Sequence, residues 1–131
     1  MPKHIPATIP GLTLQQPYCW QLMEGRFTKE RRTGMIDYRG PIAIIAGKRP
    51  SDLPTRIKQF FGDIKGLPDI DDLPFNAIVG VVDLVDVHRS EEPGMPFVWE
   101  LCNPRRLKKP EPHQGAGYVL EIESELVRKL L

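Results

Sequence analysis

The residues best suited to chemistry lie in one short segment, residues 25–32 (GRFTKERR), which combines a glycine, a carboxylate and several cations. If residues 27–32 form a strand, alternation places Thr28, Glu30 and Arg32 on one face. A carboxylate and a guanidinium two residues apart on one face can pair with each other, or together grip a planar polar ligand. The alternative is a solvated edge strand whose charges prevent mispairing. This segment alone leaves both interpretations open.

The elements on either side of this segment are expected to position it. Residues 16–24 are predicted to form a helix that accepts Pro17 in its first turn and ends when Gly25 adopts a left-handed conformation. Residues 41–46 (PIAIIA) have the near-continuous apolar pattern of a strand covered on both faces, so we expect the central strand there. Lys48 and Arg49 follow and place two cations where that strand reaches the surface.

The rest of the chain predicts short strands and helices separated by turns. Further strands are expected at residues 12–14, 76–87, 96–101 and 117–122, with Gly80 as a candidate bulge. A helix near residues 52–61 would place Ile57, Phe60 and Phe61 on one face, and a last short helix begins at Ser124. These elements indicate an α+β, mainly β class, as a small mixed barrel or twisted sheet with two or three short helices.

The segments between these elements are interpreted as connections. Residues 62–73, 88–94 and 103–110 are expected to be loops, the last of them basic. Residues 1–10 contain three prolines and are expected to form an extended arm that is mobile or lies along the surface. Residues 11–131 then form a single domain.

Composition is that of an ordinary globular protein, with 131 residues of which 40% are hydrophobic and 27% charged. No apolar run approaches the roughly 20 residues of a membrane-spanning helix, and the first residues lack a signal-peptide core. We therefore expect a cytoplasmic protein with no membrane partner. Cys19 and Cys102 have no metal-ligand spacing, and reduced thiols are expected. His4, His88 and His113 are scattered, so no metal site and no cofactor are predicted.

Charge is unevenly distributed along the chain, although the formal net charge is only +1. Residues 1–66 carry eleven Lys or Arg against five Asp or Glu, whereas residues 67–131 carry seven against twelve. If the first half forms one surface, that surface is a modest basic patch able to hold a few phosphates. If the two halves interleave in the fold, the fields cancel.

Several stretches in a fixed order resemble the ASCH domain family of the PUA-like superfamily. They are the pattern Gly25-x-x-x-x-Glu30-x-Arg32 and residues 12–20 (LTLQQPYCW), 38–48, 77–84, 97–101 and 103–110. The resemblance covers most of the chain and implies a small PUA-like β-barrel with a cleft beside the first helix. Members of the family have been proposed to bind RNA. Some bacterial relatives are amidohydrolases of acetylated cytidine, and others have been described as ribonucleases.

The chain departs from the family pattern at three positions that bear on catalysis. Phe27 stands where the family motif has a lysine, Glu30 where the amidohydrolase relatives have a threonine, and Ile45 where many members have a histidine. A carboxylate can act as a base, but Phe27 has no nitrogen with which to activate or stabilise a reacting group. These differences argue against amidohydrolase chemistry.

The resemblance implies that Glu30, Arg32, Lys48 and Arg49 gather at the lip of the cleft. The cations would hold phosphate or a base edge, and Glu30 would accept hydrogen bonds from an exocyclic amine. Tyr18 is the best candidate for stacking on a base.

A second basic group starts with Arg105 and Arg106 and continues through Lys108 and Lys109. It is either a solvated loop or, if it lies on the cleft side, an extension of a phosphate track.

Three functions from different classes follow from these residues. The first is a nucleic-acid-binding module for single-stranded or modified RNA, which uses Tyr18, Glu30, Arg32 and Lys48. The second is a hydrolase of a modified nucleoside or of RNA phosphodiester bonds, with Glu30 as base and Lys48 as its electrostatic partner. The third is a protein-interaction adaptor whose acidic second half meets a basic partner.

Overall fold

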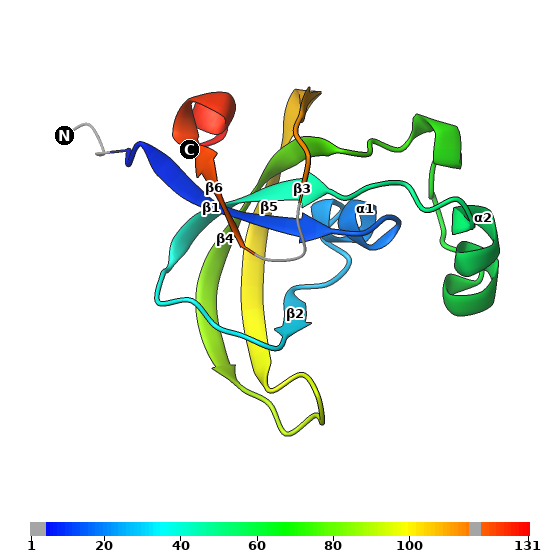
Figure 1. The fold of residues 1–131 in the computed structure, drawn as a ribbon, viewed down its shortest axis with the longest axis horizontal. Coiled ribbons are helices and arrows are strands. Elements are labelled where there is room, and N and C mark those ends of the chain that lie inside the picture. The colour runs from blue at the N-terminus through cyan, green and yellow to red at the C-terminus, as the bar shows by residue number, and fades with distance from the viewer. Residues whose placement is uncertain (1–4, 116–118) are drawn as a thin grey trace.

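The computed structural model describes residues 5–115 and 119–131, and within them the chain forms one six-stranded mixed sheet (Figure 1). The strand order is β2-β5-β4-β3-β1-β6. The strands are β1 (Thr8–Leu14), β2 (Lys29–Arg32), β3 (Gly40–Ala46), β4 (Ala77–Arg89), β5 (Phe97–Pro112) and β6 (Leu120–Glu123). The predicted α+β, mainly β class is confirmed.

The helices of this part of the chain are short. They are α1 (Tyr18–Met23), α2 (Leu53–Arg56), the π-helical turn η1 (Ile57–Phe61), and the 3-10 helices η2 (Ile70–Asp72) and η3 (Ser124–Leu130). None of the described helices has the length and apolar character needed to cross a membrane.

Strand β3 lies inside the sheet, where its apolar run predicted it. It pairs in parallel with β1 and antiparallel with β4, and residues 42–46 are fully buried. Alternate side chains of β3 pack in two different hydrophobic clusters. Ile42 and Ile44 pack in the cluster that contains α1 residues and Trp99, whereas Ile45 packs in the cluster that contains Val127 of η3. A strand covered on both faces must be apolar at every position, which explains its composition.

Strands β4 and β5 are longer than the sequence indicated. Residues 103–110, expected to form a basic loop, continue β5 and pair with β4, for example Arg106 with Gly80. Residues 88 and 89, also expected in a loop, belong to β4. Three register shifts and a positive φ of 56° at Asn103 let the pairing continue through residues that disfavour regular strand. One shift lies between Ile78 and Gly80, so the predicted bulge at Gly80 is confirmed.

The prediction that residues 1–10 form an extended arm is wrong for its last three residues. Thr8, Ile9 and Pro10 belong to β1 and pair with β6, and Ile9 is buried. Pairing satisfies their backbone groups and covers an apolar side chain, which outweighs the proline content that suggested a free arm. Residues 1–4 of that arm lie outside the described residues. So do residues 117–118 of the last expected strand, which is found as β6.

The helix expected near residues 52–61 does not bury its apolar face. α2 gives way to the π-helical turn η1, closed by a hydrogen bond from the Gly62 N–H to the Ile57 carbonyl at 2.9 Å. The segment stands apart from the sheet (Figure 1), and Phe60 and Phe61 remain 76% and 40% exposed. The wider winding changes the angular positions that the α-helical period assumes.

Candidate functional site

Helix α1 presents Tyr18 at the boundary between core and surface. Gly25, with a φ of 72°, follows the helix as the sequence predicted. The Tyr18 ring stacks on Phe27, with ring centroids 4.2 Å apart and planes inclined by 29°. The opposite side of the helix anchors it in the core through Cys19, Leu22 and Met23.

Strand β2 holds Glu30 in a nearly buried position, 8% exposed, directly opposite Trp99 of β5. Its Oε1 lies 3.9 Å from Nη1 of Arg32, so the two side chains share a face as strand spacing predicted. The Arg32 guanidinium lies over the Trp99 ring, 5.6 Å from its centroid. Oε2 of Glu30 is buried and has no hydrogen-bond partner among the described residues. A buried acceptor without a partner costs free energy.

The protonation of Glu30 and of its neighbour Tyr18 is set mainly by burial. Burial raises the pKa of the Glu30 carboxyl above its ordinary value, while the Tyr18 hydroxyl and the Arg32 charge oppose the rise. Burial also raises the pKa of the Tyr18 phenol, and the nearby Glu30 charge adds to that rise. At neutral pH Tyr18 therefore stays a neutral hydrogen-bond donor beside Glu30.

Glu30 should make the stability of the protein depend on pH. Because its folded-state pKa lies above its unfolded value, its contribution to stability is fully present below the unfolded pKa and is lost as pH rises through the folded pKa. Glu30→Gln has no titrating group at this position and does not lose this contribution. The free energy of unfolding of the variant should therefore rise relative to that of wild type as pH increases from the unfolded-state pKa of Glu30 through its folded-state pKa. Urea unfolding across pH measures the difference. The exposed Glu91→Gln is the control, and an equal gain there would contradict the explanation.

A groove passes Tyr18 on the side of α2 and η1. One part, of about 700 Å³, is lined by Tyr18, Gln15 and the exposed rings of Phe60 and Phe61. An adjoining part, of about 680 Å³, is lined by cationic and polar residues that include Lys48 and Arg49. The two parts share the lining residues Gln15, Pro50, Asp52 and Arg56, so they form neighbouring sections of one depression.

The cations of this groove differ in how far they are already neutralised. Arg49 lies 2.9 Å from Asp71, and Arg56 lies 2.9 Å from Asp52. Lys48 is exposed and forms no ion pair with any described residue. It is therefore the groove cation most open to a phosphate. No hydrogen bond or ion pair joins Lys48 to Glu30 within the described residues, so the two proposed partners of a catalytic pair are not in contact.

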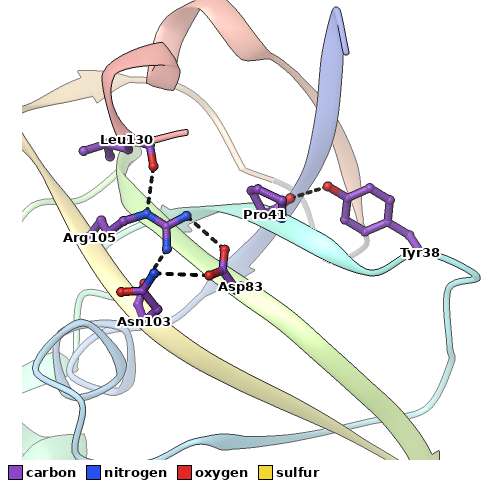
Figure 2. A network of polar contacts seen from close by, with 6 residues as sticks. All are labelled: Tyr38, Pro41, Asp83, Asn103, Arg105 and Leu130. Atoms are coloured by element: carbon purple, nitrogen blue, oxygen red, sulfur yellow. Dashed lines mark hydrogen bonds and ion pairs between the residues drawn. The ribbon is translucent and has the colours of Figure 1, made fainter. Parts of the chain in front are cut away.

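Arg105 belongs to a different part of the molecule, where it holds the C-terminal η3 against the sheet (Figure 2). Its Nε donates to the Leu130 carbonyl at 2.8 Å and its Nη1 to the Asn103 carbonyl at 2.6 Å. Its Nη2 donates to Oδ1 of Asp83 at 3.0 Å. Each nitrogen of the guanidinium is thus engaged within the fold, and Arg105 does not line the groove.

Arg106 was a candidate for an extension of a phosphate track, but it also lies outside the groove. It pairs with Glu24 at 3.0 Å and lines a separate, mainly apolar cavity of about 240 Å³ beside α1. Cys19 lines the same cavity, and burial raises the pKa of its thiol to about 12. The other cysteine, Cys102, is exposed, and both thiols are free.

The sequence analysis missed Phe60 and Phe61 as groove residues. It placed both rings with Ile57 on one face of a helix, and no polar motif marked them as binding residues. A signal was present, because neighbouring residues on an α-helix point about 100° apart, so adjacent phenylalanines cannot both face one narrow core contact.

No protein-family model matches this chain, and no curated protein matches it either.

Proposed function

We propose that the protein binds single-stranded RNA in the groove beside α1, with bases against Tyr18, Phe60 and Phe61 and the phosphate backbone at Lys48. The observation that carries the proposal is the meeting of exposed aromatic rings and an unpaired cation in adjoining parts of one groove. Proteins bind single strands by stacking bases on aromatic side chains along a basic track, because every base has a π-face and every linkage a charge. A ring that is 76% exposed, as in Phe60, has the free surface that stacking needs.

Glu30 and Arg32 line neither part of the groove, but Glu30 interacts with the groove residue Tyr18, and we propose that it selects among the bases bound there. Its unpartnered Oε2 can accept a hydrogen bond from an exocyclic amine, which cytosine, adenine and guanine carry and uracil lacks. Arg32 beside it supplies donors for a carbonyl oxygen or a phosphate. A ligand amine would also remove the cost of the buried unpartnered oxygen, so bases with an amine are favoured over uracil.

The resemblance to ASCH domains agrees with this proposal, since members of that family have been proposed to bind RNA. We further propose that the mixed sheet is the PUA-like barrel of that family. The register shifts between β4 and β5 support this, because bulges bend and twist a strand pair in the way a closed sheet requires. The curvature of β4 and β5 in Figure 1 is consistent with such bending.

Fluorescence anisotropy with a short labelled single-stranded RNA, at low and at physiological salt, tests the proposal. Wild type should bind in a salt-sensitive manner. Lys48→Ala should weaken binding and reduce the slope of log K against log salt by about 0.7–1, the effect of one lost phosphate contact.

Lys129→Ala is the matched control, because Lys129 lies in η3 and lines neither part of the groove. No binding at low salt would refute the RNA proposal. An equal loss in Lys48→Ala and Lys129→Ala would place the RNA elsewhere on the surface.

A further inference from the structure

We propose that Asp86, His88 and Glu100 form a binding site for a divalent transition metal, with Zn²⁺ as the ion that fits best. Asp86 and His88 are two residues apart on β4, so alternation places their side chains on one face. Glu100 is the direct partner of Asp86 on β5. Each residue offers a ligand atom, and these three atoms lie within 4.8 Å of one another.

The imidazole of His88 has the orientation of a metal ligand. Its Nδ1 lies 3.2 Å from the carbonyl oxygen of Arg89, to which a protonated Nδ1 donates. The lone pair is then on Nε2, which lies 3.7 Å from Oε1 of Glu100. Metal-binding histidines use their second nitrogen in this way, because the hydrogen bond selects the tautomer and raises the basicity of the ligating nitrogen. In the tautomer whose Nδ1 donates to Arg89, Nε2 of His88 and Oε1 of Glu100 both offer lone pairs, an arrangement that a cation between them satisfies.

The charges around the cluster point to the same ion. Asp86 and Glu100 are like charges at directly opposed positions of an antiparallel pair, which is destabilising. Lys29 and Arg39 compensate them weakly, since the Lys29–Glu100 and Arg39–Asp86 contacts are both 3.9 Å, beyond hydrogen-bond length. A divalent cation between the two carboxylates compensates both charges at once.

The ligand chemistry selects among cations. Ca²⁺ and Mg²⁺ favour sites made of oxygen alone, whereas one imidazole with two carboxylates suits Zn²⁺. Bonds of about 2.0–2.2 Å to Zn²⁺ place neighbouring ligand atoms about 3.4 Å apart. The three ligand atoms, now within 4.8 Å of one another, can reach this separation by side-chain rotation, because the residues are partly or fully exposed. Three protein ligands leave a coordination position for water or an external donor.

The cluster is independent of the RNA groove. Lys29 and Glu100 alternate with Glu30 and Trp99 along β2 and β5, so the cluster lies on the sheet face opposite Glu30. The expectation of no metal site was drawn from the scattered histidines in the sequence. It overlooked this set because His88 and Glu100 come together only through the register of β4 and β5.

Isothermal titration of the metal-free full chain with ZnCl₂ tests the site. Wild type should bind one ion at the cluster, and His88→Ala should lower the affinity by at least about 10-fold, as even the loss of an outer-shell partner does. His113→Ala is the matched control, because His113 is a histidine outside the cluster. It should leave the affinity unchanged. Cys102→Ser should also retain binding, since the exposed thiol is not one of the three ligands.

Nitrogen-15 NMR of the histidine side chains provides the second measurement. Zn²⁺ should shift the Nε2 resonance of His88 far more than its Nδ1 resonance, because Nδ1 stays with the Arg89 carbonyl. The proposal is overturned if wild type takes up no zinc, if His88→Ala binds as tightly as wild type, or if Cys102→Ser abolishes binding.

Discussion

Gly80→Ala is expected to lower the free energy of unfolding by about 3 kcal/mol, the upper end of the usual cost of overpacking. A Cβ at this position would lie 2.1 Å from the Arg105 carbonyl oxygen and 2.6 Å from Cε of Met23. The Met23 side chain can rotate away, but the carbonyl belongs to the β5 backbone and moves only if the β4–β5 pairing shifts. Urea unfolding and thermal melting measure the loss, which corresponds to a melting temperature about 10 °C lower.

The matched control for this variant is Gly34→Ala. Gly34 lies in the connection between β2 and β3, and an added Cβ there meets no atom within 4 Å. Its carbonyl accepts the Trp99 indole N–H at 3.0 Å, and the substitution leaves that group in place. If Gly80→Ala were as stable as Gly34→Ala, the close packing of β5 on β4 at the bulge would be wrong.

Phe60→Ala is expected to weaken binding of single-stranded RNA by about 5- to 150-fold, the equivalent of the 1–3 kcal/mol that one base–aromatic stack contributes. The ring is 76% exposed and lines the groove, so its loss should leave folding stability almost unchanged. This separation of affinity from stability makes it a cleaner test than Tyr18→Ala, whose ring also packs on Phe27. Anisotropy titration together with urea unfolding gives both quantities.

Met35→Ala serves as the control for the loss of exposed apolar surface. Met35 is 53% exposed and lies outside the groove. Its removal should change neither RNA affinity nor stability. Equal affinities for wild type and Phe60→Ala would remove the stacking surface from the proposed function while leaving the Lys48 test intact.

Two kinds of feature could be predicted from the sequence. In one, a single residue constrains the backbone, and in the other, a run of apolar residues is compatible with only one kind of secondary structure. Residues 42–46 are apolar at every position, and only a strand covered on both faces buries them all. Gly25 takes a positive φ after α1, and Gly80 marks a bulge. Glu30 and Arg32 share a face because strand alternation is local.

The parts that could not be predicted depend on distant pairing. Residues 103–110 contain prolines and cations that favour a loop locally, and only the partner strand β4 makes them part of β5. Arg105 was a candidate for a phosphate track, but its position opposite Val81 brings its guanidinium to Asp83 and the Leu130 carbonyl. Phe60 was placed with Ile57 on one face of an α-helix, because nothing local signals a π-helical turn.

The two thiols differ in exposure, so the rate at which Cys19 is labelled by a thiol reagent can report local opening of the fold, with Cys102 as the reference. Cys102 is exposed and should react with a thiol reagent at once, whereas Cys19 is fully buried with its pKa raised to about 12. Its labelling must therefore wait until α1 separates from the sheet, so its rate reports the free energy of that single motion. Because Tyr18 immediately precedes Cys19 on α1, a ligand bound at Tyr18 should slow the labelling of Cys19 and leave that of Cys102 unchanged.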